Sequence, residues 1–189
     1  MHAVEIALLN YGLKFGILDC YFPFMPDKKY ILSKEVAAKK LRRLALEIIE
    51  NNFDEKELIL AGIRGSGTVV AECIQRNITE LSPLKTKLIT LTLDKKDPKD
   101  VELSEKIDFN NKIIIVIDDV ANSGKTMLYA LKAFISSHPK KIQTLALVER
   151  SHKQFPIHAD YRGLSVASTR QEHIYVEVND TEVLGAYLQ

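Results

Sequence analysis

The sequence of 189 residues lacks tryptophan and contains only two cysteines. Cys20 and Cys73 lie far apart and outside any Cys-x-x-Cys pattern, so they indicate neither a zinc site nor a disulfide framework. There is no apolar run of roughly 18 residues that could form a transmembrane helix. Residues 1–24 also lack the basic start and small-residue cleavage site of a secretory signal. We therefore expect a cytoplasmic protein with no membrane partner.

The sequence also lacks an excess of either charge sign, because 26 Lys and Arg residues face 25 Asp and Glu residues for a formal net charge of +1. No global field draws such a chain toward nucleic acid, so any RNA contact requires a local basic patch. A hydrophobic content of 46% in a chain of this length is typical of one domain with a substantial core. We predict that domain over residues 25–189. Residues 1–24 form an extension that is either a translated upstream region or specific to a family.

Strands and helices are predicted to alternate along the domain. Ser33 is a plausible cap for an amphipathic helix that ends near Asn51 or Asn52. The charged stretch 94–111 lacks periodicity and contains Pro98, so we expect a mobile loop there. The alternation predicts an α/β fold with a central parallel sheet flanked by helices. The expected strands are 57–61, 87–93, 113–117, 144–148 and 174–178, and the other expected helices are 68–76 and 126–136.

The most informative segment begins with Asp118 and Asp119, which follow a run of β-branched residues. Ligands usually bind at this carboxyl end of a strand in α/β sheets. The segment Ser123-Gly124-Lys125-Thr126 then opens a helix, whose backbone N–H groups and dipole can receive a phosphate. The carboxylates would repel a phosphate but suit a diol. The carboxylates and the start of the helix together predict a ribose 5-phosphate site. The alternative is that the segment has no binding role and is an acidic turn before a capped helix. A nucleotide P-loop is ruled out, because its pattern requires glycine where Asp119 stands.

A second glycine loop, Gly62-Ile63-Arg64-Gly65-Ser66-Gly67, lies between another predicted strand and helix. Glycines let backbone amides approach an anion closely, and Arg64 could add charge. Such turns are also common without any function, so the loop gains weight only from its place in the order of elements.

The stretch from Ile114 to Thr126 resembles the phosphoribosyl pyrophosphate (PRPP) motif of type I phosphoribosyltransferases. More narrowly, residues 30–188 resemble the family of bifunctional pyrimidine-operon attenuation regulators and uracil phosphoribosyltransferases. The similarity includes Ile31-Leu32-Ser33 and Ile89-Thr90-Leu91. It is strongest from Leu147 to Tyr161, which resembles the base-covering hood of that family and its following loop.

The resemblance implies a type I phosphoribosyltransferase fold with a small hood and a flexible flap. It implies that the catalytic residues are Asp118, Asp119 and Arg64, and that the pyrophosphate contacts Arg64, Gly65 and Ser66. Glu149 and Arg150, which follow an apolar run, could line the base pocket, with a surface ion pair at a strand end as the alternative. No protein-bound metal is expected, and Mg²⁺ would be bound through PRPP. The implied PRPP-binding residues are Asp118, Asp119, Ala121, Asn122, Ser123, Gly124, Lys125 and Thr126.

The resemblance further implies transfer of ribose 5-phosphate from PRPP to a nucleobase, with uracil as the base, in a homo-oligomer that we expect to be a dimer. Two departures remove positive charge: Ser66 stands where the family has arginine, and Leu93 stands near a basic position of the flap. They favour an alternative, a nucleotide-sensing regulator that binds RNA with weak or no catalysis. A purine-type transferase is a third reading. The basic patch predicted for RNA comprises Lys39, Lys40, Arg42, Arg43, His152 and Lys153.

Overall fold

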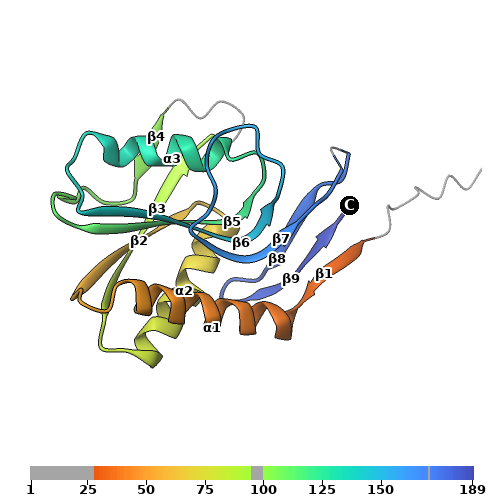
Figure 1. Cartoon of the computed structure of the whole chain (residues 1–189), viewed down its shortest axis with the longest axis horizontal. Helices are drawn as coiled ribbons and strands as arrows, with labels where there is room; N and C mark the ends of the chain where they lie inside the picture. The colour runs from red at the N-terminus through yellow and green to blue at the C-terminus, as the bar shows by residue number, and fades with distance from the viewer. Residues whose placement is uncertain (1–27, 95–99, 170) are drawn as a thin grey trace, which may run out of the picture.

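The computed structural model describes residues 28–94, 100–169 and 171–189 (Figure 1). The predicted extension, residues 1–24, lies outside the described residues, as does part of the predicted flap, 95–99. The elements follow in the order β1 (Lys29–Ser33), α1 (Lys34–Asn51), β2 (Glu57–Ile63), α2 (Ser66–Leu81), β3 (Lys85–Leu93), β4 (Val101–Leu103), β5 (Ile113–Ala121), α3 (Lys125–Ile135), β6 (Lys141–Arg150), β7 (Tyr161–Val166), β8 (Ile174–Val178) and β9 (Val183–Leu188).

A central sheet has the strand order β4-β3-β2-β5-β6-β7. Its strands are parallel except β4, which pairs antiparallel with β3. Figure 1 shows α1 and α2 on one face of this sheet and α3 on the other. The predicted α/β class, with a central parallel sheet flanked by helices, is confirmed.

The core lies on both faces of β5, which explains its continuous apolar run. Ile113, Ile115 and Ile117 join the cluster formed with α1 and α2, whereas Ile114 and Val116 join the cluster formed with α3. Alternate side chains of a strand point to opposite faces, so a central parallel strand needs apolar residues at every position. Each fully buried isoleucine contributes about 1.5–3 kcal/mol to folding.

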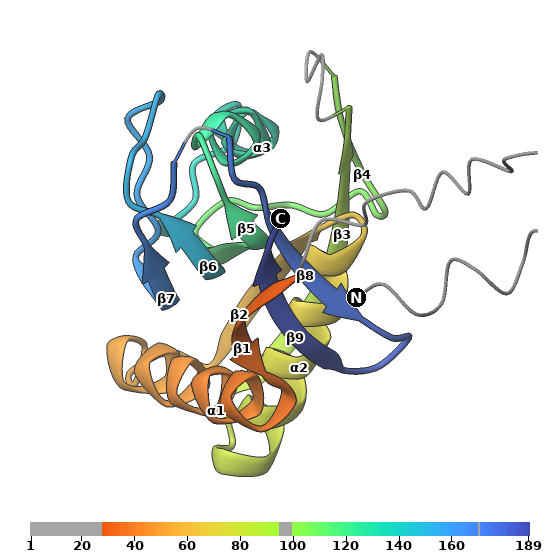
Figure 2. The same ribbon diagram turned by 90° about the vertical axis from the view of Figure 1, so that its right-hand side faces the viewer.

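A second, antiparallel sheet with the order β1-β9-β8 joins the two ends of the described chain, with Lys29 paired to Leu188. β8 contacts β5, and Figure 2 shows this small sheet in front of the central one. The hood was expected from Leu147 to Tyr161, and that placement is wrong. Leu147–Arg150 end β6 and Tyr161 begins β7, so both belong to the central sheet.

Other sequence-based boundaries also need correction. The strand expected to be last, β8, is followed by β9. The stretch 94–111 is not a plain loop, because it contains β4 and the buried side chain of Phe109, whose ring packs against Phe134 at a centroid distance of 4.9 Å. β5 continues through Ala121, so the acidic pair lies within the strand rather than after it.

Candidate active site

The two glycine loops emerge side by side at one edge of the central sheet. β2 and β5 pair in parallel, with Gly62 opposite Ile117, so their carboxyl ends lie next to each other. Each strand leads directly into a helix, α2 at Ser66 and α3 at Lys125. The positive ends of two helix dipoles therefore face the same edge, as expected for a site that binds two anionic groups.

The carboxylates of Asp118 and Asp119 occupy different environments. The Asp118 side chain is buried, its Oδ1 accepts a hydrogen bond from the Asp119 N–H at 3.0 Å, and Gly67 in the first turn of α2 lies against it. Asp119 is half-buried. The structure thus brings the predicted pair to the edge of the sheet, with one carboxylate fixed by the backbone and the other more open.

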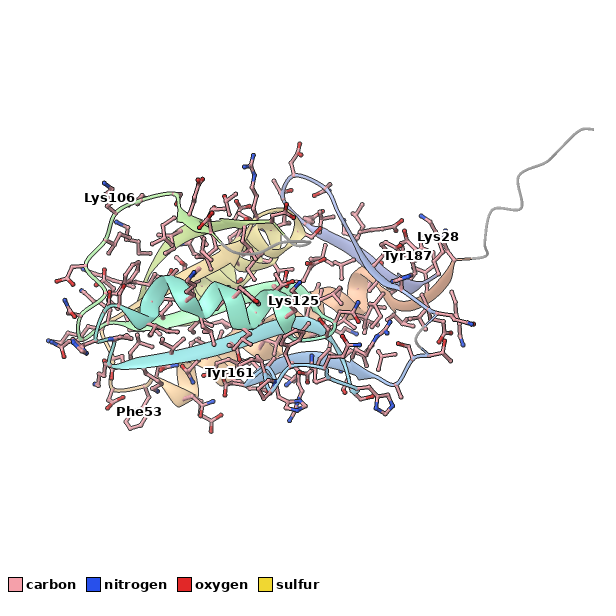
Figure 3. All side chains as sticks on the ribbon, turned by 90° about the horizontal axis from the view of Figure 1, so that it is seen from above. Lys28, Phe53, Lys106, Lys125, Tyr161 and Tyr187 are labelled. Atoms are coloured by element: carbon pink, nitrogen blue, oxygen red, sulfur yellow. The ribbon has the colours of Figure 1, made fainter. Side chains whose placement is uncertain are left out.

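The segment Ala121–Thr126 runs from the last residue of β5 through a turn into the first residues of α3. Gly124 adopts a left-handed conformation with φ of 84°, and the Ser123 Oγ accepts a hydrogen bond from the Lys125 N–H at 3.3 Å. Ala121 is buried, whereas Asn122 is exposed. Figure 3 shows Lys125 at the beginning of α3. The start of α3 and the hydroxyl-bearing residues Ser123 and Thr126 therefore lie together in this segment, the arrangement on which the predicted phosphate site depends.

A loop between β6 and β7, residues 151–160, braces this turn. The N–H groups of Gln154 and Phe155 donate to the Ser123 carbonyl at 3.1 and 3.0 Å. A Cβ atom at position 124 would lie 3.2 Å from the carbonyl oxygens of both Phe155 and Ile157. Gly124 is therefore required both by its backbone angle and by the closeness of this loop.

Gly124→Ala should lower the free energy of unfolding by about 1–3 kcal/mol, because alanine is strained at this φ and its Cβ pushes the bracing loop away. Urea unfolding measures the loss, and amide hydrogen exchange should show the Gln154 and Phe155 amides becoming less protected. Gly65 also has a positive φ, but nothing lies within 4 Å of a Cβ there. Gly65→Ala should therefore leave those two amides protected, and equal deprotection in both variants would contradict the bracing role.

The loop after β2 offers the predicted pyrophosphate-binding groups. Arg64 is exposed, and its backbone N–H is held by the Leu91 carbonyl at 2.8 Å. Gly65 has open space around it, and Ser66 begins α2. The first N–H groups of a helix have no intrahelical partner, so the start of α2 can bind an anion at this loop.

The two residues predicted to contact the base, Glu149 and Arg150, have different surroundings in the structure. Arg150 lines a hollow of about 640 Å³ together with Asn122, Ser123, His152, Lys153, Gln154 and Ser168. Its Nη2 donates to the Glu172 carbonyl, while its buried Nε and the buried Ser168 Oγ have no hydrogen-bond partner among the described residues. Glu149 is buried and does not line this hollow.

Glu149 instead accepts hydrogen bonds inside the protein. Its carboxylate receives the Ala159 N–H at 3.0 Å, the Lys153 ammonium at 3.2 Å and the Arg162 guanidinium at 3.4 Å. Burial acts to raise the pKa of Glu149, but these donors offset it and the pKa lies below the ordinary value. Neither Ser168 nor Gln154 was predicted to line the hollow, although Gln154 lies in the stretch Leu147–Tyr161 that carries the resemblance.

Another hollow, of about 630 Å³, lies at the opposite end of the central sheet and is lined by Phe53, Pro83 and Leu84 among others. None of the predicted site residues lines it, so the converging polar groups favour the end of the sheet that carries the two glycine loops.

Within the described ranges no helix is long and apolar enough to cross a membrane.

Comparisons with known proteins agree with this geometry. Residues 28–182 match the phosphoribosyl transferase domain, so the chain belongs to the phosphoribosyltransferase family. Within that family, it is 34% identical over 167 residues to the bifunctional protein PyrR of Clostridium kluyveri, covering 84% of this chain and 94% of that protein. It is also 33% identical over 172 residues to the bifunctional protein PyrR of Staphylococcus carnosus, covering 86% and 98%.

Solved structures support the same fold. The hypoxanthine phosphoribosyltransferase of Trypanosoma cruzi superimposes with a TM-score of 0.70 at 13% identity, covering 85% of this chain and 95% of that chain. A hypoxanthine-guanine phosphoribosyltransferase of Bacillus anthracis gives a TM-score of 0.63 at 20% identity, covering 78% and 85%. The predicted type I phosphoribosyltransferase fold is thereby confirmed.

Proposed function

We propose that this chain transfers ribose 5-phosphate from PRPP to uracil and releases pyrophosphate. The observation that carries the proposal is the sequence of groups at the end of β5, where a carboxylate pair is followed directly by an anion-binding turn. The hollow beside that turn gives the base a place next to the sugar. Uracil as the base rests on the similarity to the PyrR proteins.

In this reaction the carboxylates of Asp118 and Asp119 accept hydrogen bonds from the ribose hydroxyls, and the turn Ala121–Thr126 holds the 5-phosphate. The bond between C1 of the ribose and the pyrophosphate oxygen breaks, and the leaving group takes the electron pair. The sugar becomes oxocarbenium-like, the base nitrogen bonds to C1, and its proton is released. The protein orients the reactants and stabilises separating charge, so no protein nucleophile is needed.

Arg64, Gly65 and Ser66 would hold the pyrophosphate at the neighbouring strand end. Mg²⁺ would be bound mainly through PRPP, with the oxygen donors of Asp118 and Asp119 beside it, and would neutralise charge on the pyrophosphate. No group of three or more His, Cys, Asp or Glu side chains in the described part of the chain could hold a metal ion. We also keep the flap from Asp94 onward as the segment that would exclude water, although its residues 95–99 lie outside the described residues.

A panel of radiolabelled bases with PRPP and Mg²⁺ tests the proposal directly. Incorporation of uracil into a nucleotide is the expected result. Use of hypoxanthine, guanine or adenine instead would identify a purine-type transferase. No incorporation with any base would favour the regulatory alternative.

That alternative, a nucleotide-sensing regulator that binds RNA, is supported by the exposed basic side of α1. Lys39 is exposed and Lys40 is half-buried, and both lie on the helix that covers the face opposite α3 (Figure 1). Arg42 pairs with Glu80 at 2.9 Å. Arg43 pairs with Glu47 and donates to the Arg162 carbonyl of β7.

Lys153 requires a correction. It was predicted to belong to the surface patch for RNA, but its side chain is only 5% exposed and is paired with Glu149. It cannot meet an RNA phosphate in this conformation. His152 remains exposed. The patch is therefore reduced to the α1 residues and His152.

If the chain binds RNA through α1, Lys39→Gln with Lys40→Gln should flatten the dependence of log affinity on log salt by about 1.4, because each lost contact to single-stranded phosphate removes about 0.7. The measurement is a titration of a pyrimidine-operon leader transcript at several salt concentrations, with and without uridine monophosphate. Lys56→Gln with Lys106→Gln, which removes two exposed charges elsewhere, should leave the slope unchanged. An RNA affinity that does not respond to the nucleotide would argue against regulation, since a regulator must couple its two sites.

A further inference from the structure

Lys153 is a buried lysine next to the predicted phosphate site. Its side chain is 5% exposed, and its Nζ lies 2.6 Å from the Ala121 carbonyl oxygen and 3.2 Å from Glu149 Oε1. Lysine is almost never buried unless its charge is paired. The pairing here reaches from the loop after β6 to the end of β5, 32 positions away in the sequence.

The counter-ion of Lys153 is itself held in place. Glu149 is 2% exposed and is fixed by the Ala159 N–H and the Arg162 guanidinium as well as by Lys153. His158 Nδ1 lies 3.9 Å away. Burial lowers the pKa of Lys153, although Glu149 and Asp118 act to raise it. Because the Glu149 carboxylate is fixed by these contacts, it restricts where the Lys153 ammonium group can lie.

Three consecutive residues of the loop 151–160 donate hydrogen bonds to two backbone carbonyls of the segment Ala121–Gly124, which is predicted to bind the phosphate. Lys153 holds the Ala121 carbonyl, and the N–H groups of Gln154 and Phe155 hold the Ser123 carbonyl. In a trans peptide the C=O and the following N–H point in opposite directions. Drawing the Ser123 carbonyl toward the loop therefore turns the Gly124 N–H away from it, to the side where a phosphate can accept it.

We propose that Lys153 is a positioning residue, whose ammonium, anchored by Glu149, fixes the Ala121 carbonyl and so keeps the turn Ala121–Gly124 in the shape that receives the 5-phosphate. The proposal rests on the proposed function for the identity of the ligand. The tether, by which we mean the link from Glu149 through the Lys153 ammonium to the Ala121 carbonyl, does not depend on that function. It also gives Glu149 a role other than the base contact that the resemblance implied.

The tether is tested first without ligand, by amide hydrogen exchange of residues 120–126. Lys153→Met removes the ammonium but keeps the length of the side chain, and it should make these amides exchange faster. Lys153→Arg should restore most of the protection, since a guanidinium can still bridge a carbonyl and a carboxylate. Lys106→Met, which removes an exposed charge at the far end of the molecule from Lys125 (Figure 3), should change nothing there.

Because Lys153→Met leaves a buried carboxylate with fewer partners, the double variant Glu149→Gln with Lys153→Met keeps the site neutral and guards against a failure to fold. It should show the same faster exchange at 120–126. If the amides of residues 120–126 exchange as slowly in the folded double variant as in the parent, Lys153 does not fix this segment, whether or not the protein binds PRPP.

Kinetics then test the positioning role. The KM for PRPP should rise by roughly 10- to 100-fold in Lys153→Met and in the double variant, the size of effect expected when a binding group is misplaced by about 1 Å. The kcat should change little, because the turn binds the phosphate equally in the ground state and the transition state. Lys153→Arg should recover most of the KM. A parent protein that does not use PRPP would refute the proposed function, and an unchanged KM in variants with faster exchange would refute the positioning role alone.

Discussion

Replacing Asp118 and Asp119 together by asparagine is expected to abolish measurable PRPP binding while leaving the fold intact. Hydrogen bonds to charged groups contribute about 1.5–3 kcal/mol each, and every 1.4 kcal/mol corresponds to about a tenfold change in affinity. Loss of two such bonds should weaken binding by at least about 100-fold. Titration calorimetry with PRPP and Mg²⁺ measures the effect.

The fold should survive because asparagine has nearly the shape of aspartate. The Asp118 Oδ1 accepts the Asp119 N–H at 3.0 Å, and an amide oxygen at position 118 can accept the same bond. Circular dichroism and thermal unfolding check this point. Asp54→Asn provides the control, because Asp54 is an exposed carboxylate between α1 and β2, at the other end of the sheet. A double variant that binds PRPP as tightly as the parent would refute the ribose-site assignment.

The acidic strand end and the glycine turn could be predicted from sequence because their chemistry is local. Asp118, Asp119, Ser123 and Gly124 lie within seven residues, so one strand end and one helix start bring them together whatever the remaining chain does. The same holds for the segment Gly62–Gly67. The structure adds that the two segments are neighbours, which depends on the pairing of β2 with β5.

The parts that sequence missed depend on contacts between distant residues. β9 is the middle strand of the small sheet and pairs with β1 at the other end of the chain, a register that no local pattern encodes. Phe109 stands in a charged stretch and is buried by distant residues of the cluster that includes Phe134 on α3. β4 is three residues long, too short to show an alternating pattern.

Lys153 illustrates why a charged residue can be misjudged. Lysines in loops are usually solvated, and the sequence around this one contains His152 and Gln154, which also suggest a surface. Its burial requires both a carboxylate four residues earlier and a carbonyl on another strand. Only the first of these is visible in the sequence, and a Glu–Lys spacing of four is common on exposed surfaces.

Arg64→Ala is expected to lower kcat by roughly 10- to 1000-fold, where the upper part of this range, about 100- to 1000-fold, is the loss found when a preorganised donor to developing charge is removed. In the proposed reaction, negative charge accumulates on the pyrophosphate as the C1–oxygen bond breaks, and the loop that carries Arg64 would hold this group. Arg64 is the one basic residue in the segment Gly62–Gly67, so it is the side chain of this loop that could neutralise that charge. The backbone N–H of Arg64 is held by the Leu91 carbonyl at 2.8 Å, so truncating the side chain should not disturb the loop.

The measurement is steady-state kinetics in both directions, with PRPP and uracil forward and with uridine monophosphate and pyrophosphate in reverse. A contact made only in the transition state lowers kcat and kcat/KM together, whereas a contact made equally in the ground state raises KM alone. Arg64→Lys should retain part of the rate, because it keeps the charge but loses the planar fork that matches a phosphate. Lys56→Ala, which removes an exposed cation just before β2 at the opposite end of that strand, is the matched control. Parent-like kinetics in Arg64→Ala would mean that Arg64 is a solvent-facing arginine and that backbone amides of the loop and of α2 bind the pyrophosphate without it.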